Sequence, residues 1–223
     1  ADQFPEPGLD IEEELDAVDL EYVRDDLPKL IRAMKDAGDR IKSISKSLRT
    51  FSRADKTTKQ SFNLHDGIDS TVLILRHRLK ANEHRPAIEV VTDYGNIPEV
   101  HCFPGQLNQV FMNILANAID ALDDASQHLS LAEMKANPHQ ITIHTSMDND
   151  QVKIAIADNG PGIPEDIKAK IFDHLFTTKK VGKGTGLGLA IAHQIVTEIH
   201  GGAIACESEL GKGTTILIAL PIQ

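Results

Sequence analysis

Apolar positions near the start of the chain follow a strict heptad pattern. They alternate at spacings of four and three residues from Val23 to Phe51, which is the seam of a coiled-coil helix. Pro28 lies early in this run, so the regular helix is expected to begin or kink there. A seam this narrow requires a second helix beside it, and none of matching length follows. The partner is therefore expected upstream of this sequence or on a second copy of the chain.

After Arg53 the pattern changes to shorter elements of both kinds. Alternation typical of strands occurs at residues 62–64, 87–92, 100–103, 140–147, 151–157, 203–206 and 215–220. Helical periodicity occurs at 66–79, where Asp66 is the expected cap, and at 104–123, 129–136, 165–170 and 187–200. This order predicts an α+β fold with a mixed sheet and helices on one face. It divides the chain into an acidic flexible lead-in (1–18), a long helix (19–56) and a main domain (61–223).

The net charge of -10 comes from the start of the chain. Residues 1–26 hold eleven acids and one Arg, and the rest carry 22 charges of each sign. No basic face is evident, which argues against nucleic-acid binding. No apolar run approaches the roughly 18 residues of a membrane span, so we expect a cytoplasmic chain without a membrane segment. Cys102 and Cys206 lie in apolar contexts and are expected to be core residues.

A carboxylate follows the predicted strand at 151–157. Asp158 is followed by Asn-Gly-Pro-Gly-Ile, in which Gly160 and Gly162 allow backbone conformations that other residues avoid. A fixed acid at a strand end, with exposed backbone around it, suits a ligand site. Taken alone, the stretch is equally typical of an acidic surface turn.

Asn113 and Asn117 are four residues apart on the predicted 104–123 helix, so they share one face. Asn is disfavoured in helices by roughly half a kcal/mol relative to Ala, and two of them beside the apolar stripe need hydrogen-bond partners. Either they cap neighbouring loops, or they offer amide oxygens to a hard cation such as Mg²⁺.

Glycine occupies every second position from Gly182 to Gly188, just before the predicted 187–200 helix. Exposed N–H groups at such a helix start favour phosphate oxygens. The Walker pattern fails because Gly follows both Gly-Lys pairs, and the dinucleotide pattern fails because Leu187 stands where its third glycine is needed. A flexible loop is the alternative. Gly-Lys-Gly-Thr at 211–214 is, on its own, a hairpin turn.

Taken together in chain order, these motifs resemble the nucleotide-binding boxes of sensor histidine kinases. The matching segments are Asn113-x-x-x-Asn117-Ala118, Asp158-x-Gly160-x-Gly162-Ile163, Phe172-Asp173 with Phe176-Thr177-Thr178-Lys179, Gly182-x-Gly184-Thr185-Gly186-Leu187-Gly188-Leu189, and Gly211-x-Gly213-Thr214. The resemblance implies the GHKL, or Bergerat, ATP-binding fold, a two-layer α/β sandwich, over about residues 61–223. It also implies that the heptad helix is the second helix of a dimerisation and phosphotransfer hairpin.

The resemblance implies roles for individual residues. Asp158 would select adenine, Asn117 would hold Mg²⁺ against the triphosphate of ATP, and Asn113 would assist at the phosphates. Phe172 and Phe176 would anchor a mobile lid over residues 173–185, in which Lys179, Lys180 and Lys183 are candidate phosphate-facing cations. The other residues implied in nucleotide binding are Gly160, Gly162, Ile163, Thr177, Thr178, Gly182, Gly184, Thr185, Gly186, Leu187, Gly188 and Thr214.

The chain departs from the family pattern at three places. No histidine fits the phosphoacceptor box, because His65-Asp66 shares only its first two letters; the acceptor helix is expected upstream or in trans, and the chain alone is not expected to autophosphorylate. Asn113 stands where hydrolysing relatives of the fold carry a general-base Glu, which favours transfer over hydrolysis. Asp120 stands where some kinases carry a cation.

The expected function is transfer of the γ-phosphoryl group of Mg·ATP to a histidine outside this chain, for relay to a response regulator receiver domain. The working unit is expected to be a homodimer formed through residues 23–51. The alternatives are an ATP-hydrolysing member of the same fold, a dimerising scaffold that binds nucleotide without catalysis, and a serine kinase.

Overall fold

The computed structural model describes residues 24–35, 38, 58–178 and 186–222. The chain divides into two units, Ala1–Lys46 and Ser47–Gln223. Across the described part of the chain, no helix combines the length and the apolar character that crossing a membrane requires.

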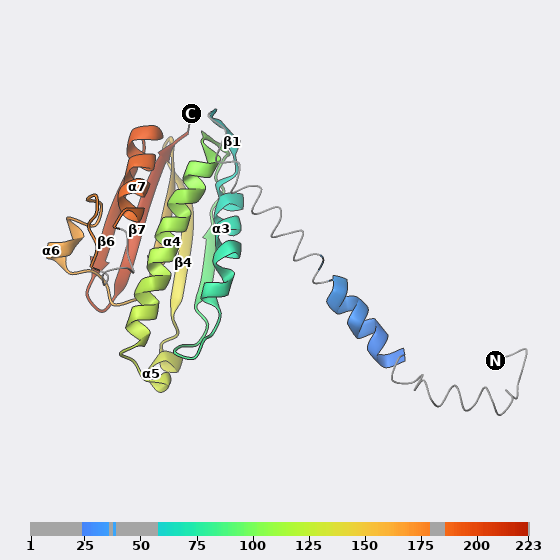
Figure 1. The fold of residues 1–223 in the computed structure, drawn as a ribbon. Coiled ribbons are helices and arrows are strands. Elements are labelled where there is room, and N and C mark those ends of the chain that lie inside the picture. Colours follow the sequence, from blue (N-terminus) through green and yellow to red (C-terminus); the bar gives the residue numbers. More distant parts are fainter. Residues whose placement is uncertain (1–23, 36–37, 39–57, 179–185, 223) are drawn as a thin grey trace, which may run out of the picture. The chain divides into compact units, whose positions relative to one another are not determined.

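The first unit contributes a helix over residues 24–35 (Figure 1). Three seam positions within it, Leu27, Leu30 and Met34, are 51, 54 and 74% exposed. The helix already covers residues 24–27, so Pro28 costs it an N–H donor but does not begin it, contrary to one of the two expectations. The other predicted seam positions lie outside the described residues, and the pairing of the seam stays a prediction.

Five strands of the second unit form a mixed sheet in the order β2-β4-β5-β7-β6. The strands are β2 (Glu89–Tyr94), β4 (Gln140–Asp148), β5 (Gln151–Asp158), β6 (Ala203–Glu209) and β7 (Gly213–Pro221). β2 pairs with β4 in parallel, and the other pairs are antiparallel. A separate two-stranded sheet joins β1 (Gln60–Phe62) to β3 (Val100–Cys102).

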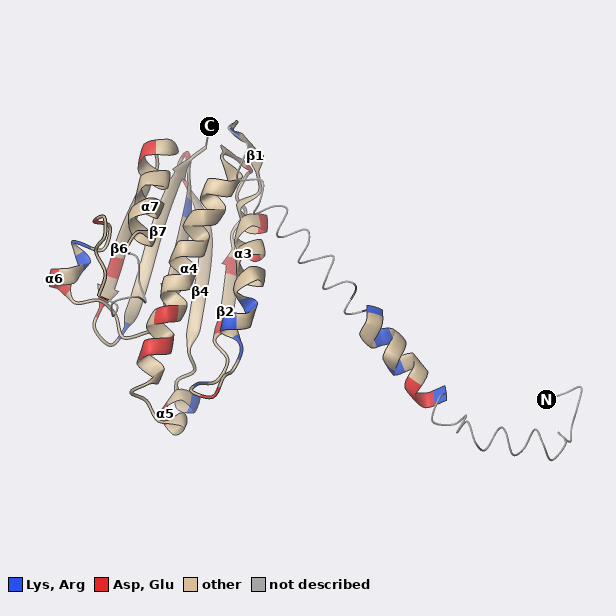
Figure 2. Cartoon of the chain, in the orientation of Figure 1, with Lys and Arg blue, Asp and Glu red and all other residues tan. Residues whose placement is uncertain are grey.

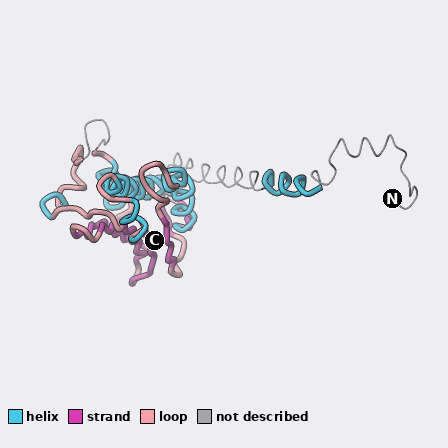
Figure 3. The backbone as a smooth tube through the Cα atoms, turned by 90° about the horizontal axis from the view of Figure 1, so that it is seen from below, coloured by secondary structure: helices cyan, strands magenta, loops and turns pink. Residues whose placement is uncertain are grey.

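The helices pack on one face of the large sheet (Figures 1 and 3). They are α3 (Leu64–Leu79), α4 (Pro104–Ser126) and α7 (Gly188–Gln194), with the shorter α5 (Leu131–Ala136) and α6 (Glu165–Lys168) in connecting segments. Alternate residues of the central strands are buried toward them, among them Ile141, Ile143, Ile154, Ile156, Ile216 and Ile218. The predicted α+β architecture, a mixed sheet with helices on one face, is confirmed.

Two local predictions were wrong. Leu64 opens α3 instead of continuing a strand, and the helix is capped by Asn63, whose side chain accepts from His65 N at 2.9 Å, and not by Asp66. Asn and Asp are equally good N-caps. Asn63 is used because it directly follows the end of β1. The predicted 187–200 helix also changes after α7 into a π-helix, Ile195–Ile199, in which His200 N donates to Ile195 O at 3.2 Å.

Two buried histidines make hydrogen bonds that suit the neutral imidazole. His200 Nδ1 lies 2.8 Å from Ile195 O, and Nε2 accepts from Phe103 N at 3.1 Å, just before α4. Burial lowers the pKa of His200, although its bond to Ile195 opposes the effect. His139 bonds to Ser126 Oγ at 2.8 Å; burial, and secondarily the positive charge of Arg85, lower the pKa of His139.

A lowered histidine pKa means that, below the ordinary value of 6.5, the unfolded chain binds more protons than the folded one. We therefore expect the free energy of unfolding to fall as the pH decreases from about 7.5 to about 5.5. Urea midpoints at the two pH values measure this. His200→Gln should remove part of the difference, whereas His128→Gln, at an exposed position, should not. A protein that becomes more stable on acidification would contradict the expectation.

Candidate functional site

A cavity of about 520 Å³ lies between α4, the turn after β5 and the segment that precedes α7. Its size is within the range of sites for small organic ligands. Its described lining consists of Asn113, Ala116, Asn117, Asp120, Ala121, Asp124, Pro161, Gly162, Ile163, Ile167, Ile171, Phe176, Thr177, Thr178, Gly186, Gly188 and Leu189.

One wall of the cavity is a polar stripe along α4. Asn113, Asn117, Asp120 and Asp124 recur at intervals of four, three and four residues, so they share the helix face next to the buried one. Asn113 Nδ2 donates to Gly188 O at 2.9 Å, which ties α4 to the first residue of α7. This bond is the one that the loop-capping interpretation expects of Asn113. Asn117 faces the cavity in the next turn.

Asp158 is the last residue of β5, directly before the turn. Its carboxylate accepts from Gly160 N at 2.9 Å and from the backbone N–H of Thr214, the residue opposite it on β7. Burial raises the pKa of the Asp158 carboxyl, and the two N–H donors partly offset the rise. Asp158, Gly160 and Thr214 adjoin the cavity without forming its wall, while residues 161–163 continue the turn into the wall.

Backbone segments approach so closely around this turn that two positions require glycine. Gly162 has φ of +74°, and a Cβ there would lie 2.2 Å from Glu209 O. Gly213 has φ of +103°, and a Cβ there would lie 1.9 Å from Asp158 O. The Gly-x-Gly-Thr turn, which on its own was no more than a hairpin, therefore holds the strand end that carries the acid.

Ser208 completes this contact, and no sequence pattern predicted it. Its Oγ accepts from Ile163 N at 2.8 Å and donates to Gly213 O at 2.9 Å. The two partners lie 45 and 5 residues away along the chain. Nothing in the pattern around Ser208 distinguishes it from any other strand serine.

The segment before α7 closes a third side of the cavity. Phe176, Thr177 and Thr178 line it, whereas Phe172 packs against the core with its ring centroid 5.4 Å from that of His193. Gly186 and Gly188 line it, and Leu187 does not. Lys179, Lys180, Gly182, Lys183, Gly184 and Thr185 lie outside the described residues, so their roles stay predictions.

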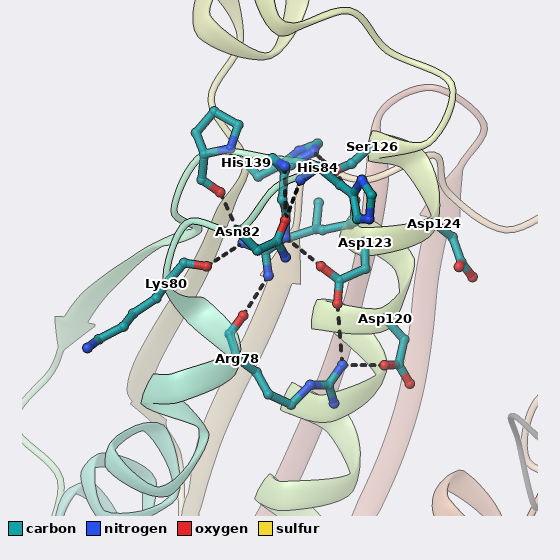
Figure 4. A network of polar contacts seen from close by, with 12 residues as sticks. Arg78, Lys80, Asn82, His84, Asp120, Asp123, Asp124, Ser126 and His139 are labelled. Carbon is teal, nitrogen blue, oxygen red and sulfur yellow. Dashed lines mark hydrogen bonds and ion pairs between the residues drawn. The ribbon is translucent and has the colours of Figure 1, made fainter.

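An ion-pair network stands beside the acidic half of the α4 wall (Figures 2 and 4). Arg78, in the last turn of α3, pairs with Asp120 and lies 3.5 Å from Asp123. Arg85, whose side chain is 1% exposed, donates to Asp123 at 2.5 Å and to three backbone carbonyls between residues 78 and 86. The sequence singled out Asp120 but not Arg78, because the pattern of α3 does not show which residue it meets 42 positions later.

Among the described residues, no group of three or more His, Cys, Asp or Glu side chains could hold a metal ion. A hard cation at this wall would be held by side-chain oxygens of α4, such as that of Asn117, together with water and oxygens of its ligand. Mg²⁺ is commonly bound in this way, with phosphates supplying part of the coordination.

Comparisons with known proteins agree on one kind of domain. The family model for histidine kinase-, DNA gyrase B- and HSP90-like ATPases matches residues 103–223. The sensor kinase CckA of Brucella abortus is 35% identical over 86% of this chain, which spans 20% of that protein. The nucleotide-free catalytic domain of the histidine kinase ThkA is 27% identical, with a TM-score of 0.57 over 73% of this chain and 95% of that one.

A further solved structure, ThkA in complex with the response regulator TrrA, is 23% identical to this chain. Its TM-score is 0.57, and the match covers 88% of this chain and 52% of that one. At this level of identity, the similarity concerns the fold alone.

Gly162→Ala tests whether the turn depends on close approach as well as on backbone conformation. Gly201 is the matched control, because it has φ of +64° but nothing within 4 Å of a Cβ. Gly201→Ala should cost about 1 kcal/mol of unfolding free energy, the ordinary penalty for a left-handed residue. Gly162→Ala should cost at least about twice as much, since the clash adds to that penalty. Equal losses in urea denaturation would show that the contact with Glu209 relaxes freely.

Proposed function

Because this chain belongs to the family of histidine kinase-, DNA gyrase B- and HSP90-like ATPases and carries a catalytic domain of the sensor histidine kinase type, we propose that it binds Mg·ATP in the cavity and transfers the γ-phosphoryl group to a histidine. This is the family that the motifs predicted. One observation carries the proposal: a single cavity gathers residues from four separate motifs, namely the α4 amides, the turn after β5, Phe176–Thr178 and Gly186–Gly188.

Asp158 would select the base. A carboxylate accepts a hydrogen bond from the exocyclic amine of adenine, whereas guanine presents a carbonyl at that position and would be repelled. The donors on Gly160 and Thr214 hold the Asp158 carboxylate in one orientation. They also favour its ionised form against the opposing effect of burial. This arrangement supports an adenine-specific site.

The α4 amides would serve the phosphate end. Asn117 would hold Mg²⁺, which when bound neutralises charge on the phosphates and orients them. Asn113 bonds to Gly188 O and, being an amide, cannot take a proton from water. In the proposed reaction an imidazole nitrogen forms a bond to the γ-phosphorus as the bond to the departing ADP breaks. The neutral Asn113 supports this transfer over hydrolysis.

The partners follow from the same proposal. The phosphoacceptor histidine would lie on a helix upstream or on another molecule, and a homodimer would form through residues 23–51, where Leu27, Leu30 and Met34 are exposed. ThkA, which shares this fold, has been solved with a response regulator. We propose that a receiver domain of that class accepts the phosphoryl group from the histidine, and that this region works in the cytoplasm, where ATP is supplied.

Asp158→Asn should weaken ATP binding by roughly a hundredfold, because it removes a charged hydrogen-bond acceptor from a half-buried site. Calorimetric titration of the full chain in the presence of Mg²⁺ measures the loss. The matched control is Asp150→Asn in the exposed β4–β5 turn, which should bind like the wild type. The wild-type chain should reject GTP. Undiminished ATP affinity in Asp158→Asn would contradict the assigned role.

Phosphotransfer is tested by incubating the chain with γ-labelled ATP and Mg²⁺, alone and with a histidine-bearing hairpin of the same class. Label should appear only on the hairpin, and it should be acid-labile and base-stable, as expected of a phosphoramidate. A hairpin with His→Gln at the acceptor position is the control.

Four results would contradict or replace the proposal. Acid-labile label on this chain alone would show that it contains its own acceptor. Acid-stable label on the hairpin would indicate a serine kinase. Steady phosphate release that disappears in Asn113→Ala would support the hydrolase. ATP binding with neither phosphotransfer nor hydrolysis would support the alternative of a dimerising scaffold that binds nucleotide without catalysis.

A further inference from the structure

The polar side chains of the cavity wall along α4 change from neutral to charged halfway along it. Its first two polar residues, Asn113 and Asn117, carry neutral amides, whereas the next, Asp120, carries a carboxylate and lines the same cavity. A carboxylate accepts hydrogen bonds and donates none. An acid at this point of the wall therefore suits a ligand group that donates, and it is a poor neighbour for phosphate oxygens.

Two contacts define how α4 runs past the site. Near its middle, Asn113 bonds to Gly188 at the start of α7. Farther along, Leu122 approaches the turn that follows the adenine-selecting acid, since a Cβ on Gly160 would lie 3.5 Å from Leu122 Cδ2. The helix thus passes from the proposed phosphate end of the cavity to the proposed base end.

Asp120 stands between those two ends. With a rise of about 1.5 Å per residue, it lies about 4.5 Å along the helix axis beyond Asn117 and about 3 Å before Leu122. In the proposed function the metal and phosphates lie at Asn117 and the base lies at Asp158. The part of ATP that lies between base and phosphates is the ribose.

Arg78 holds the Asp120 carboxylate in place (Figure 4). The side chains of the pair are 37 and 32% exposed, and the same guanidinium lies 3.5 Å from Asp123, which the buried Arg85 binds from the other side. The positive charge of Arg78 offsets a carboxylate that would otherwise repel the triphosphate. A carboxylate has about four acceptor positions, so pairing with one guanidinium is compatible with a further donor.

Apart from its phosphates, ATP offers hydrogen-bond donors at the adenine amine and at the two ribose hydroxyls, and the amine is assigned to Asp158. We propose that Asp120 accepts a hydrogen bond from a ribose hydroxyl of the bound nucleotide, and that Arg78 is a positioning residue that orients its carboxylate. The inference rests on the proposed function and extends it: the site distinguishes ribonucleotides from deoxyribonucleotides.

Calorimetric titration of the full chain with ATP, 2′-deoxyATP and 3′-deoxyATP, each with Mg²⁺, tests the proposal. The wild type should bind ATP about tenfold more tightly than at least one of the two deoxynucleotides, the usual effect of losing a hydrogen bond to a charged group. Asp120→Ala should bind ATP only as tightly as the wild type binds that deoxynucleotide, so the preference disappears. Asp150→Ala, in the exposed β4–β5 turn, should keep it.

Arg78→Gln provides a second test that leaves the Asp120 side chain intact. It should reduce the preference for ATP over the deoxynucleotide, whereas Arg76→Gln, at an exposed position in the same turn of α3, should not. A merely structural effect of Arg78 would lower the affinity for both nucleotides together and leave their ratio unchanged. The ratio, measured on one variant at a time, therefore separates positioning from stability.

Several outcomes would overturn the assignment. They are equal wild-type affinity for all three nucleotides, an equal loss of ATP and deoxynucleotide binding in Asp120→Ala, and a preference removed by Asp124→Ala instead. None of these outcomes would contradict the binding of ATP in the cavity. A wild-type chain that binds none of the three would instead overturn the proposed function, so the two failures are distinguishable.

Discussion

The packing of α4 on the sheet is the interaction on which the site depends. Leu107, Phe111, Leu115 and Leu122 are buried along one stripe of this helix, and each such side chain contributes roughly 1.5–3 kcal/mol when fully buried. Turning the helix by one residue would expose several of them at once. The rotation of α4 is therefore fixed by apolar contacts, and the neighbouring polar stripe faces the cavity as a consequence.

The opposite side of the site is built mainly from backbone. The end of β5 and the start of β7 lie so close that only hydrogen fits between Gly213 and Asp158 O, and Ser208 bonds both to Ile163 N and to Gly213 O. This arrangement sets the Asp158 carboxylate against two fixed N–H donors. Fixed dipoles of this kind need no reorganisation when a ligand arrives.

The sequence was most informative where a local pattern decides the structure. Alternation located the strands, and the spacing of Asn113 and Asn117 placed both amides in one wall. It was uninformative where a contact spans the chain, as for Arg78 with Asp120 or Ser208 with Ile163. The π-helix and the Asn63 cap were missed because two acceptable local solutions compete there, and packing chooses between them.

The parallel pairing of β2 with β4 has a consequence for folding. Parallel neighbours need a long crossover, and here α4 lies within it, so the edge of the sheet and one cavity wall are completed in the same step. No single loop or hairpin contains all the residues of the site. A ligand that bridges α4, the β5 turn and the start of α7 would oppose cooperative unfolding of the whole unit, and the melting temperature would report ligand concentration.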